Sequence, residues 1–147
     1  MLSFVTIPLS GALSDRFGRK RVYIIGSLLT GIYGFVYFGL LNTTAPALIV
    51  LAIILSFVPH DIMYGPQAAL ISEQFTPRLR YSGCSIGYQL ASITAGGPAP
   101  IIATALLAAY GSAYVIAAYI AVCAIVSIVA TAMMEDHTGK DISQEIV

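Results

Sequence analysis

The stretch that decides the fold is GALSDRFGRKR, residues 11–21, which places one acidic and four basic side chains between two long apolar segments. Lipid cannot solvate such a group of charges, so this stretch must lie in water. The apolar segments on either side then have to turn at a membrane surface. The cluster therefore predicts a chain that crosses a membrane and returns, with residues 11–21 at one face.

The composition supports a membrane protein throughout. The chain is 58% hydrophobic and 10% charged, with a mean hydropathy of +0.87, whereas soluble domains carry roughly 25% charged residues. Residues 81–134 contain no Asp, Glu, Lys, Arg or His. One element of a soluble core could be this apolar, but not every element, and so the composition excludes an ordinary soluble domain.

Charged and turn-forming residues divide the chain into runs that can each cross a bilayer, for which a helix needs about 20 apolar residues. The runs do not alternate apolar and polar residues, so we expect helices and not the strands of a membrane barrel. We predict one transmembrane domain with spans at 22–41, 47–72, 83–108 and 113–134, followed by a polar tail at 135–147.

Residues 1–13 are apolar but too short to cross, and Pro8 and Gly11 interrupt them. A signal peptide would place its basic residues before the apolar run, whereas here they follow it. We interpret this segment as the last half of a helix whose beginning is missing. The expected fold class is thus an all-α integral membrane bundle, with a half-helix and four transmembrane helices.

All seven Lys and Arg residues lie in three segments, namely 16–21, 78–80 and the tail. Four spans place these three segments on one side of the membrane, and the turns on the other side carry no charge. The positive-inside rule assigns the basic side to the cytoplasm. We therefore expect a multi-pass protein of the plasma (inner) membrane with a cytoplasmic C-terminus.

One acidic side chain, Asp61, lies inside a predicted span. A carboxylate at mid-membrane costs about 2.5–3.5 kcal/mol even on permissive scales, and it tends to face a cavity or a partner. On a helix, His60, Tyr64 and Gln67 share one face with Asp61 at its edge. This stripe is a candidate solute or proton pathway. The alternative is that His60 and Asp61 lie at a hydrated helix end or pair only for structure.

A second, neutral stripe in the third span includes Tyr88 and Gln89, which could contact solute or bond neighbouring helices. Small residues predict close helix packing in the first, third and fourth full spans. They are Gly26, Gly31, Gly34 and Gly39, then Gly83, Gly87, Ala91, Gly96 and Gly97, and then Ala113, Ala117, Ala121 and Ala124. Two prolines within residues 96–100 predict a bend, because each removes a backbone donor.

Several function classes find no support in the residues. There is no nucleophile motif and no phosphate-binding loop, so we expect neither an enzyme nor a cofactor. Cys84 and Cys123 both fall inside spans, where they behave as small apolar residues, and no metal site or disulfide is expected. No basic face with aromatic platforms suggests a nucleic acid partner.

The loop pattern formed by Gly11, Asp15, Arg16, Gly18, Arg19 and Lys20 resembles the cytoplasmic loop motif of the major facilitator superfamily of transporters. The segments YGPQAALISE (64–73), RLRYSG (78–83) and GYQ (87–89) are similar to its metabolite:proton symporter branch. Members of that family have twelve helices in two halves. On this template the chain resembles a C-terminal fragment, from the end of helix eight through helix twelve.

The resemblance implies proton-coupled symport of a small organic acid or zwitterion across a lipid bilayer. The solute cavity of the family lies between its two halves, so the missing N-terminal half, or another helical subunit, is an expected partner. Two alternatives remain at this stage: a small subunit that assembles as a dimer, or a non-transporting membrane protein or pseudogene product that only packs with other helices.

The loop motif also implies a latch at the cytoplasmic face, meaning a set of contacts between helix ends that holds one conformation. Asp15 can reach the start of the helix near Ser82, where backbone donors favour an anion. Arg16 or Arg19 can pair with Glu73 at the end of the second span, and such contacts break when a transporter changes conformation. The alternative is a static loop that only anchors the topology. The latch candidates also include Arg78 and Arg80.

Overall fold

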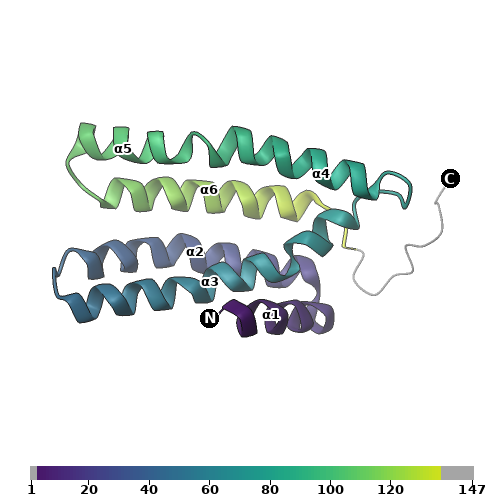
Figure 1. Cartoon of the computed structure of the whole chain (residues 1–147), viewed down its shortest axis with the longest axis horizontal. Coiled ribbons are helices and arrows are strands. Elements are labelled where there is room, and N and C mark those ends of the chain that lie inside the picture. The colour runs from purple at the N-terminus through teal and green to yellow at the C-terminus, as the bar shows by residue number, and fades with distance from the viewer. Residues whose placement is uncertain (1–2, 137–147) are drawn as a thin grey trace.

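The computed structural model describes residues 3–136, which form a bundle of helices with no strand in that range (Figure 1). Four segments are long and apolar enough to cross a membrane: α2, α3, the continuous α4–η1–α5 segment, and α6. Together with the shorter α1, they confirm the predicted all-α integral membrane fold. The predicted tail falls outside the described residues from position 137 onward. The elements are α1 (Ser3–Phe17), α2 (Arg19–Leu41), α3 (Pro46–Ser72), α4 (Arg80–Ala91), the π-helix η1 (Ser92–Gly96), α5 (Ala99–Tyr110) and α6 (Tyr114–Met133).

Tight turns make successive helices antiparallel. Gly18 alone separates α1 from α2, with a φ of +97° that side chains rarely adopt. At the opposite end of the bundle, Pro46 begins α3, where its missing N–H and fixed φ suit the first turn. Gly111 ends α5 in the left-handed region, and its N–H bonds the Leu107 carbonyl at 2.8 Å. We call the end that holds Gly18 the basic end of the bundle.

Small residues let α1, α2, α3 and α6 approach closely, as predicted from the glycines of α2 and the alanines of α6. A Cβ added to Gly26 of α2 would lie 2.8 Å from the backbone nitrogen of Met63 of α3. On its other side, α2 meets α6 where a Cβ on Gly31 would lie 3.1 Å from that of Ala124. Dispersion between closely packed backbones stabilises such contacts in lipid.

The third long helix bends where residues 96–100 predict it. The N–H of Gly97 donates to the carbonyl of Ser92 at 2.9 Å, a π-type bond, and Pro98 and Pro100 contribute no donor. The close packing predicted from the small residues of this segment is wrong for the described residues: no residue from 80 to 110 is buried, and nothing lies within 4 Å of a Cβ added to Gly87 or Gly96. Here α4 contacts α3 and α5 contacts α6. In Figure 1 this segment forms one edge of the bundle, beyond α6.

Candidate functional site

Arg19 joins three helices at the basic end. Its Nη2 and Nε lie 2.8 and 3.0 Å from Oδ1 of Asp15 at the end of α1. Its Nη1 forms an ion pair with Glu73, which directly follows α3 and has a side chain only 5% exposed. Of the two arginines predicted to reach Glu73, the structure places Arg19 there.

Lys20 connects the same loop to the last helix. Its ammonium donates to the carbonyls of Ala132 and Met134 at 2.8 and 2.7 Å, which are groups left without helical partners where α6 ends. Beside it, the side-chain amide of Gln74 donates to the carbonyl of Glu135 at 2.9 Å. The loop therefore holds the ends of α1, α2, α3 and α6 together.

The remaining loop residues depart from the expected latch. The predicted cap of the helix near Ser82 by Asp15 is wrong in this conformation, because Asp15 instead binds Arg19, and α1 does not contact α4 within residues 3–136. Gly11 lies inside α1, where a Cβ would sit 3.9 Å from the carbonyl of Gly65 in α3. Arg16 and Arg78 are exposed.

Asp61 is buried near the middle of α3, with 1% of its surface exposed. The hydroxyl of Thr6 in α1 donates to its carboxylate. Its own backbone carbonyl accepts from the Ser10 hydroxyl at 2.8 Å. Nδ1 of His60 lies 3.0 Å from the other carboxylate oxygen. Asp61 is thus held in the α1–α3 interface by hydroxyl and imidazole groups, away from either end of its helix.

The predicted stripe divides between two sides of α3. While Asp61 faces α1, the His60 side chain is 58% exposed and its ring stacks on Tyr64, with centroids 5.5 Å apart. Tyr64 is exposed and Gln67 is half-buried. Consecutive helical residues differ by about 100° in direction, and this rotation places the carboxylate and the imidazole against different neighbours.

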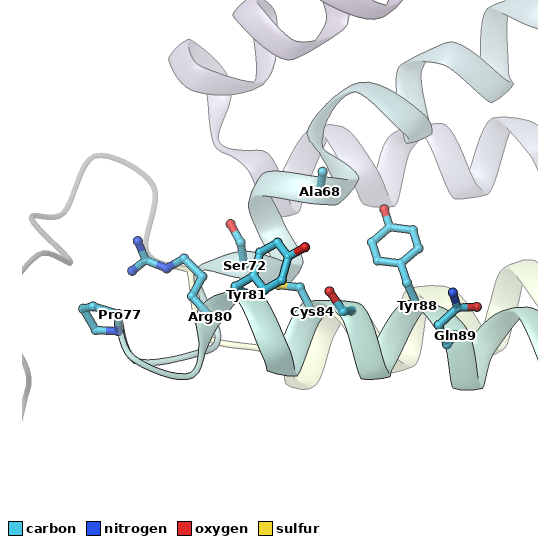
Figure 2. A pocket seen from close by; sticks show the side chains of 9 residues that line it. Ala68, Ser72, Pro77, Arg80, Tyr81, Cys84, Tyr88 and Gln89 are labelled. Atoms are coloured by element: carbon cyan, nitrogen blue, oxygen red, sulfur yellow. The ribbon is translucent and has the colours of Figure 1, made fainter.

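A cavity of about 680 Å³ lies between the end of α3 and α4 (Figure 2). It brings together Tyr88 and Gln89, predicted as pathway residues, with Arg80, predicted as part of the latch. In Figure 2 these three side chains project from α4 on the side where Ala68 and Ser72 of α3 lie. A guanidinium, a phenol and an amide around one cavity can bind an oxygen-rich solute.

Sequence reasoning missed Thr6 and Ser10, which hold Asp61, and Gln74, which reaches the end of α6. Thr6 and Ser10 are spaced four residues apart in an apolar helix, and this spacing is the signal that could have indicated a polar face. The sequence could not identify Asp61 as their hydrogen-bond partner, because these contacts depend on how α1 crosses α3.

A bundle of four long apolar helices with one carboxylate buried inside a span is typical of a multi-pass membrane protein. The family model for the Major Facilitator Superfamily matches residues 1–145, and the chain belongs to this family. No solved structure matches the chain.

Three relatives indicate the range of proteins that the chain resembles. The shikimate transporter of Escherichia coli (strain K12) is 37% identical over 92% of this chain and 31% of its own length. The citrate-proton symporter of Klebsiella pneumoniae is 34% identical over 71% of this chain and 24% of its own. The glycine betaine/proline/ectoine/pipecolic acid transporter of Dickeya dadantii (strain 3937) is 29% identical over 90% of this chain and 26% of its own length. The chain thus spans less than a third of these relatives.

Proposed function

We propose that this chain is part of a secondary active transporter that couples protons to the movement of a small organic acid or zwitterion. Membership of the superfamily supports the transporter class. Two relatives are by name a shikimate transporter and a citrate-proton symporter, which favours an organic acid as the solute and a proton as the coupling ion.

The observation that carries the proton coupling is the burial of Asp61. Its side-chain hydrogen-bond partners in the described chain include Thr6 and His60, a hydroxyl and an imidazole. Burial makes the ionised carboxylate costly, hydrogen bonds from Thr6 and His60 offset part of that cost, and taking up a proton changes both contributions. Proton binding at Asp61 therefore changes the energy of the α1–α3 interface, as a coupling site must.

The solute site of this proposal is the cavity between α3 and α4. Arg80 supplies a positive charge for a carboxylate, while Tyr88 and Gln89 supply hydrogen bonds. Because α4 has no buried residue, a further helical body is needed to cover it. The N-terminal half of the transporter, or another helical subunit, is the partner that we propose.

In the same proposal the basic end of the bundle lies in the cytoplasm of the cell, at the plasma (inner) membrane, as the positive-inside rule requires. The C-terminus then lies in the cytoplasm too. The Arg19–Glu73 pair acts there as a latch of one conformation, which opens during alternating access.

The test is paired solute uptake and proton flux in vesicles that hold the natively expressed protein. We expect Asp61→Asn to abolish proton-driven accumulation while exchange of solute across the membrane persists. The matched control is Asp136→Asn, which removes a carboxylate beyond the end of α6. If Asp61→Asn accumulates solute against a gradient with the pH dependence of the parent, Asp61 is structural and the proposed coupling site is wrong.

A further inference from the structure

A groove between α1 and α2, with α3 as its floor, has no role in the transport mechanism proposed above. It has two parts, of about 330 and 260 Å³, which share Ser10, Leu13 and Ile62. The first part reaches Arg21 near the start of α2, and the second reaches Val58 near the middle of α3. The two parts therefore form one groove, the α1–α2 groove, which runs from the basic end of the bundle to its middle.

The α1–α2 groove is apolar and opens at the outer surface of the bundle. Two of its polar lining residues, Ser10 and Asp61, are buried and hydrogen-bonded within the α1–α3 interface. Its large apolar side chains, in contrast, are between 47% and 63% exposed, and they are Leu9, Leu13, Phe17, Ile25 and Val58. A molecule in the groove is therefore reached from outside the bundle and contacts mostly hydrocarbon.

The length of the α1–α2 groove matches one leaflet of a bilayer. Along α1 its lining extends from Thr6 to Phe17, a distance of eleven residues that rise about 16 Å at 1.5 Å each. The hydrocarbon core of a bilayer is about 30 Å thick, so one leaflet supplies about 15 Å. An acyl chain whose headgroup lies at the basic end would follow the groove to mid-membrane.

Arg21 places a positive charge where the headgroup of such a lipid would lie. Its side chain is exposed, and none of the ion pairs found within residues 3–136 involves it. The neighbouring Arg19 and Lys20 are instead occupied by carboxylates and by the end of α6. A guanidinium can donate two parallel hydrogen bonds to a phosphate. The exposed Arg16 adds a positive charge at the same end, which favours a headgroup with a net negative charge.

We propose that the α1–α2 groove binds an anionic phospholipid, with its phosphate at Arg21 and one acyl chain between α1 and α2. The chain covers the apolar lining from Phe17 to Val58, beside the interface that holds Asp61. A flat apolar surface would exchange phospholipids with little regard to their headgroups, whereas this groove retains one kind. The inference goes beyond the proposed transport and does not depend on the identity of the solute.

The first test measures the phospholipid that the natively expressed protein retains after purification in a mild detergent, by mass spectrometry of the intact protein. The source membranes contain both phosphatidylglycerol and phosphatidylethanolamine, and the parent should retain the former in preference. We expect Arg21→Gln to lower the retained phosphatidylglycerol about tenfold, because it removes hydrogen bonds from a charged donor. Arg21→Lys should keep most of it. The control, Arg78→Gln, removes the same charge at the same end but outside the groove, and it should match the parent.

A second pair of variants tests the acyl chain. Ile25→Trp fills the groove, whereas Ile32→Trp adds the same bulk two turns along α2, at a similarly exposed position outside the groove. A ligand that binds only the folded state stabilises it. Added phosphatidylglycerol should therefore raise the unfolding temperature of the parent and of Ile32→Trp, but not that of Ile25→Trp or Arg21→Gln. Each variant is compared with itself without lipid, so a less stable variant still gives an answer.

Three results would overturn the inference. Equal retention of phosphatidylglycerol and phosphatidylethanolamine by the parent would mean ordinary lipid contact at the surface. Equal retention of phosphatidylglycerol by Arg21→Gln, Ile25→Trp and the parent would place the lipid elsewhere on the protein. A parent that retains no phospholipid, and that phosphatidylglycerol does not stabilise, would mean that another segment of the protein covers the groove.

Discussion

Arg19, at the start of α2, ion-pairs with Glu73, which follows α3 and keeps only 5% of its side-chain surface exposed. The second carboxylate oxygen of Glu73 is buried and has no hydrogen-bond partner in the described part of the chain. The neutralisation of this carboxylate therefore depends on Arg19, whose other partner, Asp15, is far more exposed.

This dependence predicts an asymmetric response to substitution. Removing one partner of a buried pair costs about 3–5 kcal/mol, and we expect Arg19→Gln to destabilise the protein by about 3 kcal/mol, since Arg19 is itself partly exposed. Glu73→Gln should cost less, because it leaves no buried charge. The double variant should recover much of the loss in a thermal unfolding assay in detergent. Strictly additive effects would show that the pair is not coupled.

Lys20 provides a second, weaker test of the basic end. Lys20→Met removes the donor to the Ala132 and Met134 carbonyls, and a cation at a helix C-terminus contributes about 0.3–1 kcal/mol. We expect faster amide hydrogen exchange over the last turn of α6 and little change in α1. The matched control is the exposed Arg21→Met, which removes the same charge one residue along. Equal exchange in the two variants would argue against the cap.

The α1–α3 crossing predicts a large effect from one methyl group. A Cβ on Gly65 would lie 2.9 Å from both the Gly11 nitrogen and the Ile7 carbonyl oxygen, and closer still to Ser10. Overpacking of this kind costs about 1–3 kcal/mol, so Gly65→Ala should lower the unfolding temperature. Gly87→Ala is the control, because nothing lies within 4 Å of its added Cβ, and it should be neutral or slightly stabilising. A similar effect at both sites would contradict the close crossing.

These features differ in how far the sequence could predict them. Helical class, spans and the one-sided charges depend on local composition, so the fold class and the basic loop could be predicted. The sequence limited the partner of Glu73 to Arg16 or Arg19, because the arginine and the carboxylate had to lie at the same membrane face. The partners of Asp61 could not be predicted, since Thr6 reaches it only through the backbone crossing at Gly65. The exposure of the His60 side chain beside the buried Asp61 likewise depends on which helices pack around α3.

The cavity between α3 and α4 predicts how charge affects solute affinity. Arg80 lines this cavity, whereas the nearby Arg78 is exposed and does not line it. A hydrogen bond to a charged group contributes about 1.5–3 kcal/mol, so Arg80→Gln should raise KM for an anionic solute by about tenfold or more, with little effect on a neutral analogue. Arg78→Gln removes the same charge at the same membrane face and should leave KM nearly unchanged, which separates direct binding from long-range attraction. The measurement is uptake over a range of solute concentrations, for an organic acid and for its neutral ester. It distinguishes direct binding by Arg80 from long-range attraction. If both arginine variants raise KM equally, and high salt removes the effect, the charges act only by attraction at the surface and the solute binds elsewhere.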